Sequence, residues 1–299
     1  MVIFQKFRLT FTNDYSNNSL HYPINMKKIF TIAFAVFCTF YATAQEIPTE
    51  PVPFILGQTE TIYSQVLSET RTINVYLPEG YAKEKAATYP VIYLLDGSAN
   101  EDFIHISGLV QFLTMGELMP KTIVVGIANV DRKRDFTFPT TIEKDKKDFP
   151  TTGSSAKFIS FLEKELQPYI QQNYRTSNSK TIIGQSLGGL LATEILLTKP
   201  NLFNTYIIVS PSLWWNDESL LADLPRYSKT LAEKDLKICI AVGTEGKIME
   251  RDAKNLYESL KKINGKNLKT DFLFMPEENH ATILHSSIYK SLLLLNPKK

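Results

Sequence analysis

The chain has 299 residues, 43% of them hydrophobic and 21% charged, with 33 Lys and Arg against 31 Asp and Glu and a formal net charge of +2. These are values of an ordinary globular protein, and they exclude extended disorder, a collagen-like fibre and a disulfide-dense miniprotein. The balance lacks the basic excess of a general nucleic-acid binder, and two cysteines, Cys38 and Cys239, are too few for a disulfide framework or a cysteine-based metal site.

Residues 26–44 have the pattern of a secretory signal peptide. Two lysines follow Met26, residues 29–41 are uncharged, and residues 42–44 form an A-x-A cleavage site. A membrane anchor is the alternative, but a span of the bilayer needs about 20 apolar residues. We therefore expect cleavage after Ala44, export to the periplasm or the medium, and no stable membrane insertion of the mature protein.

The signal peptide also divides the rest of the chain. Because a signal peptide begins its chain, residues 1–25 are interpreted as an upstream extension, with Met26 as the true start. Residues 45–58 are then the mature N-terminal segment and residues 59–299 a single domain. Removing everything before residue 45 takes away four basic residues and one acidic residue, which changes the net charge to −1.

From residue 59 onward, β-rich runs alternate with helical patterns. The first two runs, 59–67 and 71–77, are predicted to pair antiparallel at one edge of a sheet. Further strands, nearly continuous in apolar residues and so buried on both faces, are predicted over 89–95, 122–127, 180–183, 205–209, 236–242 and 270–275. Helices with three- and four-residue apolar spacing are predicted over 155–173, 187–199, 249–263 and 281–295. This alternation predicts an α/β fold, a mostly parallel sheet with helices on both faces, whose ligands bind at the carboxyl ends of the strands.

Residues 184–188 read Gly-Gln-Ser-Leu-Gly and match the G-x-S-x-G pattern of a nucleophile elbow. In that motif a serine occupies a tight turn between a strand and a helix, and the glycines let the two elements approach. A predicted strand ends at the motif and a predicted helix follows it directly, as the motif requires. A glycine-rich turn capped by a serine is the alternative. We predict that Ser186 is a catalytic nucleophile.

A serine nucleophile needs a base, normally a histidine held by a carboxylate. In this topology the partners follow in the order serine, acid, histidine, and only His280 and His285 lie downstream of Ser186. His280 comes directly after the last predicted strand, whereas His285 falls inside the last helix and His105 belongs to an early helix. The predicted base is therefore His280.

The acid is expected in the loop after the penultimate strand, 236–242. Glu245 is closest to the end of that strand and is the preferred candidate. Glu250 and Asp252 are the alternatives; they fall in the first turn of the following helix, where acidic side chains suit the helix dipole.

An oxyanion hole is expected from two backbone N–H groups. One belongs to Leu187, the residue after the nucleophile, and the other to the loop after strand 89–95. Gly97 and Ser98 in that loop are the candidates for the second donor, whereas Asp96 is expected only to order the turn.

Together these motifs resemble the esterase-D-like branch of the α/β-hydrolases, which includes ferric-siderophore (enterobactin-type) esterases. The resemblance covers about 59–295 and rests on YPVIYLLDG at 89–97, NVDRKRDFT at 129–137, GQSLGG at 184–189, SPSLWW at 210–215 and ENH at 278–280. It implies a serine esterase that acts on a small-molecule ester without a metal or cofactor. Its acid lies after the penultimate strand with a methionine four residues on, which matches Glu245 and Met249.

Two segments are candidates for substrate contact. Arg132 and Arg134 follow the fourth predicted strand and could bind an anionic or catecholate group, or they could belong to a solvated charge run. Trp214 and Trp215 follow the sixth predicted strand and could form an aromatic wall, or they could serve core and cap packing.

The leading hypothesis is an exported serine esterase that works through an acyl-enzyme on a siderophore lactone, an acyl ester or a feruloyl ester. An acyltransferase of the same fold and a non-catalytic ligand-binding relative are the alternatives.

The signal-peptide hypothesis predicts the N-terminus of the exported protein. When the full chain is expressed in a host that exports it, N-terminal sequencing is expected to find Gln45, because cleavage follows the A-x-A site. Recovery of exported protein that begins with Met1 would contradict both the cleavage site and the upstream extension.

Overall fold

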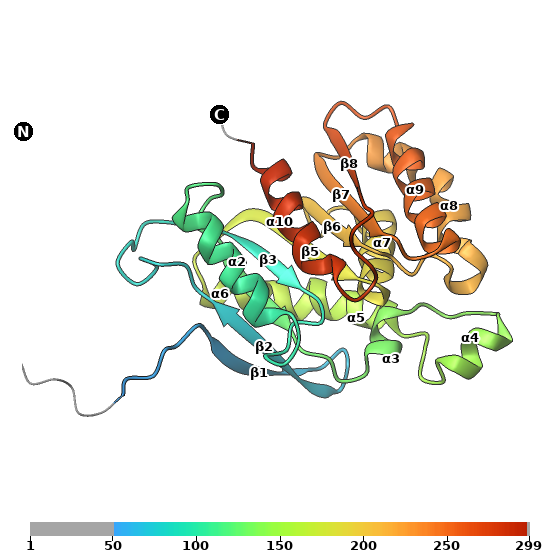
Figure 1. The fold of residues 1–299 in the computed structure, drawn as a ribbon. Helices are drawn as coiled ribbons and strands as arrows, with labels where there is room; N and C mark the ends of the chain where they lie inside the picture. The colour runs from blue at the N-terminus through green and yellow to red at the C-terminus, as the bar shows by residue number, and fades with distance from the viewer. Residues whose placement is uncertain (1–50, 298–299) are drawn as a thin grey trace, which may run out of the picture. The chain divides into compact units, whose positions relative to one another are not determined.

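Eight strands form one sheet in residues 51–297, the part of the chain that the computed structural model describes. Their order across the sheet is β1-β2-β4-β3-β5-β6-β7-β8 (Figure 1). The strands are β1 Gln58–Ser64, β2 Glu69–Tyr76, β3 Tyr89–Leu94, β4 Ile123–Ile127, β5 Thr176–Gln185, β6 Thr205–Val209, β7 Leu236–Gly243 and β8 Leu268–Met275. The predicted upstream extension and signal peptide lie outside the described residues.

Most of the sheet is parallel. Strands β3 to β8 run in the same direction, whereas β2 is antiparallel to both β1 and β4. The pair β1–β2 occupies one edge, as the sequence predicts. The predicted α/β class is therefore confirmed, and the loops that follow β3, β5, β6, β7 and β8 all leave the sheet at its carboxyl edge.

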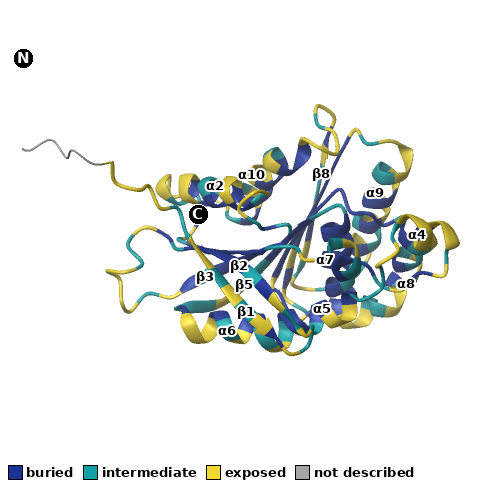
Figure 2. Cartoon of the chain, turned by 90° about the horizontal axis from the view of Figure 1, so that it is seen from below, coloured by how far each residue is buried: buried dark blue, intermediate teal, exposed yellow. Residues whose placement is uncertain are grey.

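Helices cover both faces of the sheet (Figure 2). They are α2 Phe103–Met115, α3 Arg132–Phe136, α4 Glu143–Asp148, α5 Ser155–Phe161, the π-helical turn η1 Leu162–Leu166, α6 Gln167–Asn173, α7 Leu187–Thr198, α8 Trp215–Ala232, α9 Lys247–Lys261 and α10 Ile283–Leu295. Helices α2 and α10 share one apolar cluster with the sheet, and α5 to α9 share the other. Between residues 51 and 297, no helix is both long enough and apolar enough to cross a membrane.

The continuous apolar runs of the sequence are explained by these two clusters. On β3, Val91 and Tyr93 face the cluster under α5 to α9, and Ile92 and Leu94 face the one under α2 and α10. A strand covered by helices on both faces needs apolar side chains at every position, not at every second one.

The structure differs from the prediction in several elements. Strand β5 begins at Thr176, four residues before the predicted strand; its added residues 176–179 are polar, and its pairing with β3 shifts register in this part. The short helices α3 and α4 were not predicted. Helix α8 was not predicted at all. Its first turn includes left-handed residues 216–218, and Pro225 lies in its interior, so its helical pattern is interrupted.

Helix α7 carries a half-buried acid, Glu194, outside the predicted site. Oε1 of Glu194 accepts a hydrogen bond from Ser155 Oγ at 3.0 Å, while Oε2 is buried and has no partner within the described residues. Burial raises the pKa of this carboxyl from 4.5 to about 7. The folded protein therefore keeps a proton that the unfolded chain releases between these two values.

This shift predicts a loss of stability with rising pH. The contribution of Glu194 is most favourable below pH 4.5 and declines up to about pH 7. Replacing it with the neutral isostere, Glu194→Gln, is expected to raise the free energy of unfolding at pH 8 by about 1–3 kcal/mol and to flatten its pH dependence. Chemical denaturation at pH 5 and pH 8 measures both effects. The control is Glu163→Gln, which removes a solvent-exposed ion pair with Lys199; an equal response of the two variants would contradict the prediction.

Candidate active site

Ser186 lies at the turn between β5 and α7, in a strained backbone conformation. Its φ of 59° and ψ of −119° fall outside the regions that side-chain-bearing residues prefer. The turn is tight, since a Cβ on Gly184 would come within 2.3 Å of the carbonyl oxygen of Gly188. Gly184 is therefore required by the close approach of strand and helix, whereas a Cβ at Gly188 would have its nearest contact at 3.4 Å, an ordinary distance. The hydroxyl of Ser186 projects from the carboxyl edge of the sheet, where the motif predicts it.

Glu245 and His280 lie in the loops after β7 and β8 and contact one another. Glu245 Oε2 is 2.5 Å from His280 Nδ1, and the Glu245 side chain is only 1% exposed. The two loops are joined by their backbones, because Thr244 N–H donates to the carbonyl oxygen of Glu278 at 2.8 Å. This approach requires a glycine at residue 243, where a Cβ would meet the same oxygen at 2.4 Å.

The other oxygen of the Glu245 carboxylate is also held. Oε1 accepts a hydrogen bond from Ser210 Oγ at 2.5 Å and another from the Gly243 N–H at 2.9 Å. Burial acts to raise the pKa of Glu245, but hydrogen bonds from His280, Ser210 and Gly243 outweigh it and lower the pKa below its usual value. The carboxylate is therefore ionised at neutral pH and its orientation is fixed.

The alternative acids have other contacts. Glu250 accepts hydrogen bonds from the backbone N–H groups of Glu245 and Gly246, at 2.9 and 3.0 Å, and so stabilises the start of α9. Asp252 is fully buried and pairs with Arg251. Of the three predicted candidates, the structure brings only Glu245 to His280.

The predicted base is tied to the turn at Ser186 through the residue before that serine. Gln185 Nε2 donates to the backbone carbonyl oxygen of His280 at 2.5 Å. Within the described residues Ser186 Oγ has no hydrogen bond to His280; its contact is Ser212 Oγ, at 3.3 Å. Catalytic hydrogen bonds are often long in a site without substrate.

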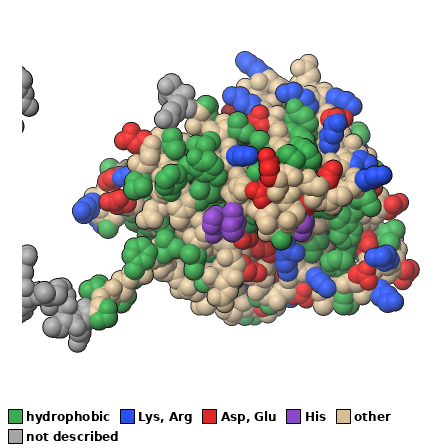
Figure 3. Space-filling model, viewed as in Figure 1, with side chains coloured by type: hydrophobic (Ala, Val, Ile, Leu, Met, Phe, Trp, Pro, Cys, Tyr) green, Lys and Arg blue, Asp and Glu red, His purple; other side chains and the backbone are tan. Residues whose placement is uncertain are grey.

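The histidine rings differ in their surroundings. The side chain of His280 is 48% exposed, and exposed histidines are visible on the face shown in Figure 3. His285 stacks on His105 between α10 and α2, with ring centroids 3.6 Å apart, and its Nε2 lies 3.7 Å from an oxygen of Asp102. The contacts of His285 are therefore with His105 and Asp102 and not with Glu245.

The expected oxyanion donors are not equivalent. Within the described residues, the Leu187 N–H at the start of α7 donates to no acceptor. The Gly97 N–H donates to the carbonyl oxygen of Ile127 at 3.0 Å, so of the two candidates for the second donor Gly97 is bound within the sheet. The Ser98 N–H donates to the carboxylate of Glu101 at 3.2 Å, an exposed contact that a ligand can replace.

Comparison with known proteins identifies the family to which this arrangement belongs. The model of the Esterase family matches residues 64–281, which is more than half of the chain. The chain belongs to the Esterase family. It is a serine hydrolase that acts on ester bonds.

The relatives place the esterase in the siderophore-esterase branch. Ferri-bacillibactin esterase BesA of Bacillus subtilis is 30% identical over 263 residues, which cover 80% of this chain and 90% of BesA. An IroE-like serine hydrolase from Shewanella oneidensis is 31% identical, with a TM-score of 0.73 and 80% of each chain covered. The BES protein from Bacillus cereus is 28% identical, with the same TM-score, and covers 84% of the esterase and all of the other chain.

Arg132 joins the loop after β3, which carries Asp96, to the turn at Ser186. Its Nε and one terminal nitrogen bind the two oxygens of Asp96 at 2.6 and 2.9 Å, and the same terminal nitrogen donates to the carbonyl oxygen of Gln185. Asp96 also accepts a hydrogen bond from Asn129 at 2.7 Å. Arg132 keeps one third of its side chain exposed, at the carboxyl edge of the sheet.

Arg134 has a structural role in the esterase. It pairs with Glu69 and Asp135, which both also bind the fully buried Arg71. These four charges connect β2 to α3 and satisfy one another. The substrate-contact prediction for Arg134 therefore has no support, because its guanidinium is already paired with two carboxylates.

The two tryptophans also differ, in how much of each side chain is exposed. Trp215 has no exposed surface, and its Nε1 donates to the carbonyl oxygen of Phe138 at 3.0 Å. Trp214 is partly exposed and packs against Phe149, with ring centroids 5.9 Å apart. Core packing accounts for Trp215, and of the two tryptophans only Trp214 can face a ligand.

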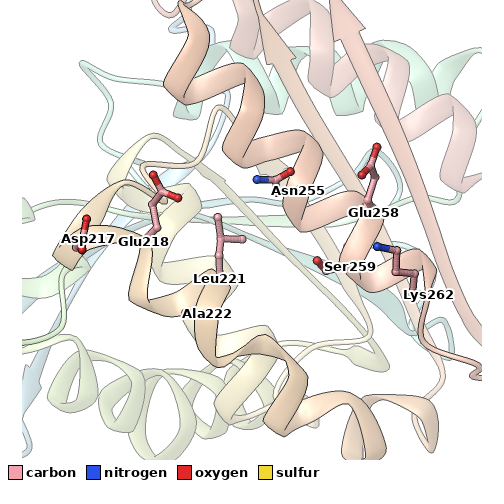
Figure 4. Close-up of a pocket in the computed structure, with 8 residues that line it drawn as sticks. All are labelled: Asp217, Glu218, Leu221, Ala222, Asn255, Glu258, Ser259 and Lys262. Atoms are coloured by element: carbon pink, nitrogen blue, oxygen red, sulfur yellow. The ribbon is translucent and has the colours of Figure 1, made fainter.

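A groove of about 410 Å³ lies between α8 and α9, outside the predicted site residues (Figure 4). It is lined by Asp217, Glu218, Leu221, Ala222, Asn255, Glu258, Ser259 and Lys262. None of the predicted site residues lines it. Across residues 51–297 there is also no group of three or more His, Cys, Asp or Glu side chains that could hold a metal ion.

Sequence reasoning missed Ser210 as a contact of the acid. The serine lies 35 residues from Glu245, and nothing in the local pattern distinguishes it from a turn residue. Its place directly after a buried strand, at the same edge as Ser186, is the signal that could have found it.

Proposed function

We propose that the esterase is exported and hydrolyses carboxylic esters through an acyl-enzyme, with Ser186 as nucleophile, His280 as base and Glu245 as acid. The observation that carries the proposal is the 2.5 Å contact between Glu245 Oε2 and His280 Nδ1, in a loop that Gln185 ties to the elbow. The strained turn at Ser186 supports the assignment of the nucleophile.

The proposed reaction begins with proton transfer. The ionised Glu245 accepts a hydrogen bond from the Nδ1–H of His280 and so keeps Nε2 unprotonated; Nε2 takes the proton of Ser186 Oγ as the hydroxyl attacks the ester carbonyl carbon. The N–H groups of Leu187 and Ser98 then stabilise the oxyanion, which replaces the Glu101 carboxylate at Ser98.

Collapse of the tetrahedral intermediate completes the acylation. The C–O bond to the alcohol breaks, and His280 returns its proton to the leaving oxygen, so that the acyl group stays on Ser186. A water molecule then attacks the acyl carbon with His280 again as base, which releases the acid and restores the serine hydroxyl. Arg132 supports these steps by holding the oxyanion loop against the elbow.

The substrate we propose is a siderophore lactone. Two observations support it: the similarity to ferri-bacillibactin esterase and the exposure of His280, since a half-exposed base suits a bulky ester. Arg132 and Trp214 are the proposed contacts for an anionic or aromatic part of the substrate, because both keep surface at the carboxyl edge.

The first test removes the nucleophile. Ser186→Ala is expected to lower kcat/KM on an aryl ester by at least about 10³-fold, because the acyl-enzyme can no longer form. Labelling by a fluorophosphonate probe is expected to disappear as well. The matched control is Ser107→Ala, which removes a fully buried hydroxyl on α2 and should leave both readouts unchanged. Full activity of Ser186→Ala would contradict the mechanism.

The second test separates substrate classes. We expect kcat/KM for a trilactone siderophore with ferric iron bound to exceed that for a feruloyl sugar ester at least 10-fold, because the half-exposed base leaves room for a bulky macrocycle. Measurement of both esters beside an aryl acetate, with Ser186→Ala as the blank, gives the ratio. A higher kcat/KM for the feruloyl ester would reject the lactone while leaving the serine mechanism intact.

A further inference from the structure

Ser210 lies directly after β6, between the strand that leads to the proposed nucleophile and the strand that leads to the proposed acid. It has no exposed surface, and its N–H donates to the carbonyl oxygen of Ala241 at 2.7 Å. Its φ of 42° is in the left-handed region, which costs a side-chain-bearing residue conformational energy. A glycine would adopt this backbone without that cost, so a serine here indicates that its hydroxyl is used.

In the part of the chain that the structure describes, the hydroxyl of Ser210 makes one hydrogen bond, to Glu245. It donates to Oε1 at 2.5 Å, and the Gly243 N–H donates to the same oxygen at 2.9 Å. Two donors on one oxygen prevent the carboxylate from rotating about its last bond. The second oxygen is thereby directed at His280 Nδ1, 2.5 Å away.

The same short segment also contacts the elbow. Two residues after Ser210, the Ser212 N–H donates to the carbonyl oxygen of Ser186 at 3.0 Å, and the two serine hydroxyls lie 3.3 Å apart. Residues 210–212 therefore bind the proposed acid at one end and the proposed nucleophile at the other. Placement of the carboxylate and placement of the nucleophile are coupled through three residues of one loop.

We infer that Ser210 is a positioning residue of the active site: its hydroxyl holds the Glu245 carboxylate in the orientation that aligns His280 with Ser186. The inference rests on the proposed function and adds to it a residue that touches neither the substrate nor the reacting atoms. It acts through Glu245 alone.

The experiment compares Ser210→Ala with Ser210→Gly. Both remove the hydroxyl, but glycine also relieves the backbone strain, so a role of the hydroxyl predicts that both lose activity. We expect kcat on an aryl ester to fall about 10- to 100-fold, because a misplaced catalytic group costs that much, with KM little changed.

The pH profile supplies a readout that a merely structural role would not move. The hydrogen bond from Ser210 is one of the contacts that lower the pKa of Glu245. Its removal raises the pKa of Glu245, so the acid limb of kcat/KM is expected to shift to higher pH. In a Glu245→Gln background, Ser210→Gly should cause little further loss of kcat, because the carboxylate that it positions is gone.

Ser107→Ala, which removes a fully buried serine hydroxyl far along the chain from Glu245, is the matched control and should keep the wild-type rate and pH profile. A Ser210→Gly protein with wild-type kcat and acid limb would overturn the inference. So would failure of both Ser210 variants to fold, since the residue would then be structural. Fluorophosphonate labelling of wild-type Ser186 separates the proposed function from the inference about Ser210. Absence of labelling rejects the proposed function. If the wild-type protein is labelled but Ser210→Gly keeps the wild-type kcat and acid limb, only the inference is rejected.

Discussion

The parallel direction of β3 to β8 is the constraint on which the site depends. Parallel strands deliver every following loop to one edge of the sheet, so side chains that are far apart in sequence meet there. Side chains at two positions would keep these loops apart, and both positions hold glycine: Gly184 before the turn at Ser186 and Gly243 at the end of β7. His280 can therefore reach Glu245, while the loop that carries His280 is hydrogen-bonded to Gln185.

The charged side chains near the carboxyl edge of the sheet form ion pairs with one another. Asp96 is neutralised by Arg132, and Glu69 and Asp135 are neutralised by Arg71 and Arg134. Buried charges need such partners because their desolvation is costly. The run of basic residues after β4 is therefore mostly structural. Arg132 and Arg134 keep similar exposed fractions, 33% and 29%, and each guanidinium is paired with a carboxylate.

Most of the fold could be predicted, because strands buried on both faces leave continuous apolar runs and amphipathic helices leave periodic ones. Helix α8 could not, since left-handed residues and a proline interrupt its pattern. Glu245 was preferred over Glu250 because it lies closer to the strand end. Glu250 is occupied by hydrogen bonds to the backbone at the start of α9, and no sequence pattern shows those bonds.

The sequence by itself determined the class of fold, the tight turn at Ser186 and the family, because these depend on periodicity and on short motifs with fixed local geometry. Tertiary structure decided which groups are free to act. It assigned the Gly97 N–H to Ile127, buried Trp215 in the core, paired Arg134 with carboxylates and brought Ser210 to Glu245. Each of these outcomes depends on contacts between distant segments, and a pattern of neighbouring residues carries no information about which partner a side chain will meet.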